Sequence, residues 1–164
     1  MAGFTGVLAA QVIALLTDTT TGVNARIKTI EENDPTLKGA GIRSIVSQNV
    51  SPEIAEISGQ ALYPALLVYC DSVENQMREK SRNFSGTIGL VIEVRQTQDT
   101  LKGIESNTEM YVDAICALLS DSRGYWGDGA SYSGAYRVDY EPVAFGGKNF
   151  LQRAKVNFAL ELSE

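Results

Sequence analysis

Histidine is absent from this chain of 164 residues. Its absence removes the commonest general base at neutral pH and the commonest zinc ligand. There is also no Gly-x-Ser-x-Gly nucleophile elbow, and in "GGKNF" Asn149 stands where a Walker loop has Ser or Thr. The sequence therefore predicts no catalytic residue, no metal site and no cofactor, and an enzyme is the least favoured class.

Cysteine and basic residues are scarce. Cys70 and Cys116 each lie among apolar neighbours at no ligand spacing, so we expect buried free thiols. Lys and Arg number 14 against 20 Asp and Glu, giving a net charge of -6 and a pI near 4.7. Binding to phosphates needs a surplus of cations, so this balance argues against a dedicated nucleic-acid binder.

Long apolar runs are missing as well. No stretch is long enough to span a bilayer, and the apolar opening "MAGFTGVLAAQVIALL" lacks the basic start of a signal peptide and is interrupted by Gln11. We therefore expect a protein of the cytoplasm that does not enter a membrane.

What is present is an ordinary globular composition. Apolar residues make up 44% of the chain, enough to bury a core. We expect one domain over residues 1–164, with an N-terminal helical segment at 1–41 and an α/β core at 42–164.

Periodicity and turn residues place the elements. Helical spacing predicts a helix over 5–32 that is broken at 18–22, a helical turn after Ser51, and a helix that Asp99 or Thr100 caps and Gly124 ends. The apolar stripe of the last helix is Leu101, Ile104, Thr108, Tyr111, Ile115 and Leu118. Alternation predicts strands near 42–48, 62–72, 84–96, 135–145 and 150–162, whereas the Gly- and Ser-rich residues 124–136 have loop composition.

The final strand is the clearest. Between Phe150 and Leu162 apolar and polar residues alternate, so one face packs on the core. Gly146 and Gly147 suit a tight hairpin before it. The fold class that satisfies every apolar stripe is α+β: a single domain with a mainly antiparallel or mixed sheet of about four to five strands, two main helices on one face, and the N-terminal helical segment.

A charged segment joins the strands near 62–72 and 84–96. It mixes both signs of charge, at Glu74, Arg78, Glu79, Lys80 and Arg82. Such a hairpin tip either serves solubility or acts as an arm that fixes the register with a neighbouring subunit. Both interpretations remain open at this point.

Four aromatic residues stand close together in the Gly- and Ser-rich segment. They are Tyr125, Trp126, Tyr132 and Tyr136. Tyr and Trp are enriched where a surface is buried against a partner. Alternatively, these side chains cover the end of the preceding helix.

The element order carries a resemblance. The strand "YPALLVY", the polar tip, the strand "TIGLVIEV", the helix after Asp99 and the closing strand "FLQRAKVNFALEL" together resemble the tail terminator or tail-completion proteins of long-tailed bacteriophages. The similarity covers residues 42–162 and depends on element order and strand texture, since no signature motif is involved. It implies an α/β fold with helices against a mixed or antiparallel sheet.

The resemblance also implies a structural role in the virion. Such proteins form rings, typically hexameric, that cap the tail tube, end its polymerisation and offer the surface to which the head attaches. The implied partners are further copies of this chain, the tube protein and the head-tail connector, with assembly in the host cytoplasm. Heterologous contacts would close the ring, and the polar row of Arg153, Lys155 and Glu161 would face a neighbour or a lumen through which DNA passes as cargo.

Two other non-enzymatic readings stay open. A neck or head-completion connector would share the virion role in a different ring. A small ligand-binding module would use the aromatic segment as a lid.

Overall fold

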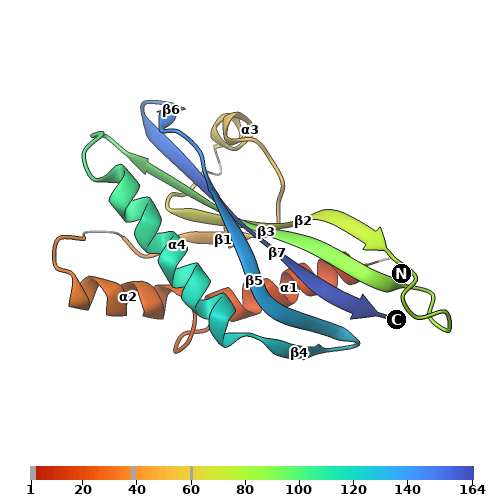
Figure 1. Cartoon of the computed structure of the whole chain (residues 1–164). Coiled ribbons are helices and arrows are strands. Elements are labelled where there is room, and N and C mark those ends of the chain that lie inside the picture. Colours follow the sequence, from red (N-terminus) through yellow and green to blue (C-terminus); the bar gives the residue numbers. More distant parts are fainter. Residues whose placement is uncertain (1–2, 38–39, 60) are drawn as a thin grey trace.

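The computed structural model describes residues 3–37, 40–59 and 61–164 of the chain. The helices in this part are α1 (Phe4–Thr17), α2 (Val23–Asn33), α3 (Pro52–Ile57) and α4 (Ile104–Asp121). The strands are β1 (Ser44–Val46), β2 (Ala65–Asn75), β3 (Ser85–Gln98), β4 (Gly124–Gly127), β5 (Ala130–Tyr140), β6 (Ala144–Gly146) and β7 (Asn149–Ser163). Figure 1 shows a single α+β domain with a curled sheet.

All of these strands belong to one mixed sheet in the order β1-β2-β3-β7-β5-β4, with β6 also paired to β7. Only the pair β1–β2 is parallel, and the other pairs are antiparallel. The α+β class is confirmed, but the expected four to five strands were too few. The strands near 62–72 and 84–96 do form the predicted antiparallel hairpin.

The main error lies in residues 124–136, which were expected to be a loop and instead form β4 and the start of β5. Asp128 and Gly129 both have positive φ, 51° and 80°, and they join the two strands. Two such residues are what a type I′ hairpin turn requires, and Asp-Gly is its strongest sequence signal. The glycines therefore shape a hairpin here.

β7 lies at the centre of the sheet. It pairs with β3 from Phe150 to Ser163, and its other side pairs with β5 and β6. The predicted final strand is confirmed, and so is its core face, because Ala154, Val156 and Leu160 are fully buried. The hairpin predicted at Gly146 and Gly147 joins β6 to β7.

One face of the sheet is covered by helices. The core contains Leu8, Val12 and Leu16 of α1 together with Ile115 and Leu119 of α4, packed over β2, β3 and β7. α2 packs against α4 and α1, so the N-terminal helices share the core of the domain. The predicted break in the N-terminal helix is confirmed, since residues 18–22 separate α1 from α2.

α4 begins later than the sequence suggested. Gly103 precedes it with φ of 83°, and the helix starts at Ile104. Leu101 was assigned to the buried stripe but lies outside the helix and is exposed. A left-handed glycine turns the chain before the helix, and this leaves Leu101 on the surface.

The opposite face of the sheet is polar and is covered at one end only. The segment that contains α3 lies over it: Arg95 donates to the carbonyl oxygen of Val50, and Ala55 and Leu67 line the same small pocket. The two faces therefore differ. Apolar packing fixes one face, whereas the other carries a charged cluster next to α3 in which Glu93 and Arg95 are buried and Arg153 and Lys155 are partly exposed.

Candidate interaction surfaces

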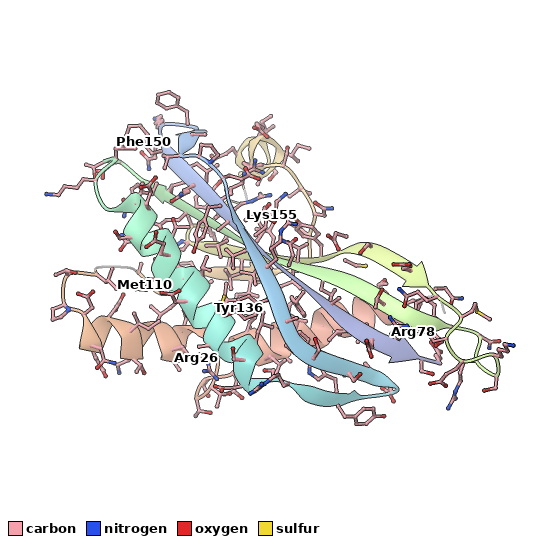
Figure 2. All side chains as sticks on the ribbon, in the orientation of Figure 1. Arg26, Arg78, Met110, Tyr136, Phe150 and Lys155 are labelled. Atoms are coloured by element: carbon pink, nitrogen blue, oxygen red, sulfur yellow. The ribbon has the colours of Figure 1, made fainter. Side chains whose placement is uncertain are left out.

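The charged tip, residues 76–84 between β2 and β3, lies at the end of the molecule that also holds the chain termini (Figures 1 and 2). Arg78 forms an ion pair with Glu161 of β7 at 3.1 Å, and Glu79 accepts a hydrogen bond from the Ser163 hydroxyl at 2.9 Å. Arg82 lies 3.5 Å from Glu79. The tip is thus folded against the end of β7, and its exposed charges, Lys80 included, remain available to a partner.

The four aromatic residues divide into two pairs. Tyr132 is buried, packs edge-on against Trp126 and Phe158, and has its pKa raised to about 12 by burial. Trp126 donates from Nε1 to the Ser122 carbonyl at the end of α4. This pair covers the helix end, which was the alternative interpretation.

The second pair is exposed. Tyr125 points away from the core at the β4–β5 hairpin, and its hydroxyl accepts a hydrogen bond from the Gly129 amide. Tyr136 of β5 lies near α4, as Figure 2 shows, and an adjacent Cys116 raises its pKa. These two residues retain the predicted role of contact residues.

Arg153 and Lys155 belong to an ion-pair cluster on the polar face of the sheet. The cluster consists of Glu93, Arg95, Glu141, Arg153 and Lys155. Strand pairing assembles it, because Glu93 lies directly opposite Lys155 and Arg95 directly opposite Arg153. Arg153 and Lys155 were predicted from the sequence as surface residues, whereas Glu93, Arg95 and Glu141 were not.

Both predicted cations in the cluster are ion-paired, although its three cations share the carboxylates of Glu93 and Glu141. Lys155 Nζ lies 3.9 Å from Glu93 and 3.8 Å from Glu141, and Arg153 pairs with the same two carboxylates. Their attraction for a phosphate backbone is therefore weak. The cluster organises the polar face, and its small surplus of positive charge gives only a modest attraction for DNA.

An apolar end was not predicted. It is formed by Ile54 and Ile57 of α3 with Phe145 and Phe150 of the β6–β7 hairpin. Ile57 is 87% exposed and Phe145 is 83% exposed, and the two phenylalanine rings stack with centroids 5.7 Å apart. A Cβ at Gly147 would lie 3.4 Å from Glu56, so hairpin and helix are neighbours. Figure 2 places Phe150 at the opposite end of the molecule from Arg78.

A groove lies at the other end of β7. It has a volume of about 610 Å³ and is lined by Phe4, Val7, Gln11, Arg82, Tyr125 and Leu162, among others. Gln11 Oε1 is buried and accepts no hydrogen bond from the residues described here. The groove combines an apolar wall with a few polar groups, as ligand pockets do.

Few chemically reactive groups converge in the described residues. Cys70 and Cys116 are free thiols, only half-buried, and burial raises the pKa of each. No three His, Cys, Asp or Glu side chains of residues 3–37, 40–59 and 61–164 are placed to hold a metal ion. Within the same ranges, no helix combines the length and apolar character needed to cross a membrane.

The comparisons with known proteins give no family. No protein-family model matches the chain, and no curated protein matches it in sequence.

Proposed function

We propose that this chain is the subunit of a ring that caps the tail tube of a long-tailed phage, ends its polymerisation and provides the head-joining surface. The apolar end is the observation that carries the proposal. α3 and the neighbouring β6–β7 hairpin both expose large apolar side chains, and exposed apolar surface of this kind is typical of protein-protein contacts. The end of the tail tube would be the partner of the apolar end. The last ring of tube subunits exposes there the surface on which a further ring would otherwise pack.

The position of the apolar end supports the same role. It lies at the start of β7, whereas the charged tip lies at the end of β7 (Figure 2). A cap needs two unlike surfaces, one for the tube and one for the head connector. Stacked rings would use opposite ends of an elongated subunit in this way.

Removing the protein from the phage tests the role. Tails longer than normal, or frayed tails that fail to join heads, are expected in electron micrographs, because the stop surface is missing. Tails of normal length beside heads that leak DNA would instead identify a connector. Complete virions would overturn the virion role.

A point variant tests the surface. Phe145→Asp should leave the subunit folded and the ring formed but produce overlong tails, since a carboxylate cannot pack against an apolar partner. Leu101→Asp is the matched control, because Leu101 is also an exposed apolar residue but is not among the residues of the apolar end. Normal tails with Phe145→Asp would contradict the assignment of this surface.

A ligand-binding module is the second candidate, and the groove that Gln11 helps to line favours it. The Gln11 side chain has an unsatisfied Oε1, so a small rotation of its amide would let a bound molecule with a hydrogen-bond donor satisfy it. A thermal-shift screen of small polar-apolar compounds tests this, with Gln11→Leu as the control. Stabilisation of the native protein that Gln11→Leu abolishes would support the module.

A further inference from the structure

Both margins of the sheet are open over part of their length. β1 pairs only with Ala65–Leu67 of β2, and β4 pairs only with residues 130–132 of β5. Within the described residues, no strand pairs with the outer side of the rest of β2 or of β5. In β2 the pairing is regular over Ser72–Asn75, just after the register shift between Cys70 and Ser72. In β5 it is regular over Tyr136–Tyr140, just after the register shift between Tyr132 and Tyr136.

These two stretches lack two of the features that protect an edge strand, proline and lysine. A register shift beside each stretch and the charges of Glu74, Arg137 and Asp139 give partial protection. Each stretch also carries exposed apolar side chains: Val73 is 49% exposed, Tyr136 is 42% exposed and Tyr140 is 49% exposed. Open backbone next to exposed apolar side chains suits a strand that another chain covers.

The geometry points to a second copy of this chain, with Ser72–Asn75 of one subunit pairing antiparallel to Tyr136–Tyr140 of the next. This inference rests on the proposed function, because it states how neighbouring subunits of the ring meet. Strand direction favours it. From β2 through β3 and β7 to β5 every pair is antiparallel, so β2 of an identically oriented neighbour continues the alternation after β5.

The two faces match as well. Val73 lies opposite Ile88 and Val138 opposite Val156, so both belong to the helix-covered face. Glu74 and Arg137 belong to the polar face. The register that places Glu74 opposite Arg137 also places Val73 opposite Val138, and it joins apolar to apolar and acid to base across the contact.

Charge argues against pairing of the β2 edge with itself. The open part of β2 carries Asp71 and Glu74 and no cation, so two β2 edges would oppose like charges. The open part of β5 supplies a cation, Arg137, that Glu74 of a neighbouring β2 edge can face. A β2–β5 contact is heterologous, and heterologous contacts are the kind that close into rings.

The shift along the strands between neighbouring subunits is compatible with a closed ring. Within one subunit, Val138 lies in the same cross-strand row as Val68, with Val156 and Ile92 between them. Pairing Val138 with Val73 of the neighbour shifts that neighbour along the strands by about 13 Å, after allowance for the bulge at Asp71. Four strands span roughly 19 Å, so the strands would tilt by about 35°, at the lower end of the range of roughly 35–45° in closed barrels.

Two edge variants test the contact. Val73→Lys damages the β2 edge and Tyr136→Lys the β5 edge. Each alone should sediment as a monomer at a concentration where the wild type sediments as a ring. An equimolar mixture should stop at dimers, because the mixture retains one intact β2 edge and one intact β5 edge that can meet. Val7→Lys, at a comparably exposed valine on α1, should still form the ring.

A charge exchange tests the register independently of folding. Glu74→Arg should weaken ring formation at least tenfold, and the double variant Glu74→Arg, Arg137→Glu should restore it. Three results would overturn the edge contact without contradicting the proposed ring. They are rings that persist in either edge variant, a mixture that forms no dimers, and a double variant that assembles no better than Glu74→Arg. A monomeric wild type would contradict the proposed ring as well.

Discussion

Arg95 donates from Nε to Glu93 Oε2 at 2.6 Å on the polar face of the sheet, and both side chains are almost fully buried. The two residues stand two positions apart on β3, so their side chains share one face. Arg95 also donates to the Val50 carbonyl, and this hydrogen bond ties the segment before α3 to the sheet. The pair thus links the ion-pair cluster to the segment before α3, which covers part of the polar face.

We expect Glu93→Gln to lower the free energy of unfolding by about 3–5 kcal/mol, the usual cost of leaving a buried charge without its partner. Glu93 lies within reach of Arg95, Arg153 and Lys155, so its loss affects three cations. Urea denaturation measures the effect. Glu141→Gln, at a half-buried position, should cost less, and an equal loss in both variants would contradict a special role for Glu93.

Leu160→Ala should destabilise the protein by about 2–5 kcal/mol, because Leu160 is fully buried on the core face of the central strand. Ala159→Ser, one residue earlier and exposed, should change stability little. Thermal unfolding followed by circular dichroism compares them. Deletion of residues 150–164 should abolish folded protein, and a cooperative melt in the truncated chain would show that β7 is dispensable.

Asp18 should make stability depend on acid pH. Its Oδ1 accepts hydrogen bonds from the Thr20 and Thr21 amides at 2.8 and 2.9 Å, and these lower its pKa from 3.8 to about 2. A folded-state pKa below the unfolded value stabilises the fold above pH 4, and this stabilisation is lost as the pH falls through 2.

The comparison is with Asp18→Ala. The wild type should be the more stable chain above pH 4, and the difference should shrink toward zero between pH 4 and 2. Urea denaturation at several pH values gives the two curves. A difference that stays constant down to pH 2 would show that the side chain acts through something other than its charge.

Reversing Arg78, Lys80 and Arg82 to Glu should leave the fold intact, because exposed ion pairs such as Arg78–Glu161 contribute only about 0–1 kcal/mol each. Assembly should fail if the charged tip contacts a neighbouring subunit or an adjoining virion protein. Analytical ultracentrifugation and infectivity assays measure this. Unchanged rings and unchanged infectivity would return the tip to a role in solubility.

Local signals predicted local structure well. The break between α1 and α2, the β2–β3 hairpin, the start of α3 at Pro52 and the long β7 all follow from spacing, caps and turn residues close in the chain. The error at residues 124–136 had a local signal too, since Asp128-Gly129 specifies a hairpin turn. In this segment the turn pair is a stronger indicator of structure than the Gly- and Ser-rich composition.

The candidate surfaces were predicted only in part. Arg153 and Lys155 lie on the polar face of β7 as the alternation predicts, and their contact with a neighbour stays a prediction. Glu93 and Arg95 stand in a mainly apolar part of β3, and nothing in the sequence nearby indicates their partners. The apolar end unites residues about ninety positions apart, Ile54 with Phe145. No short stretch of the sequence contains both residues.

The sequence by itself determined which segments are helices and strands, because apolar periodicity, caps and turn residues act over a few neighbouring residues. It also determined the core face of β7. Only the tertiary structure decided that β7 lies between β3 and β5, that Glu93 meets Arg95 and Lys155, and that the edges of β2 and β5 stay partly open. Strand order is set by how the apolar faces are best buried together, a property of the whole chain that no single strand encodes.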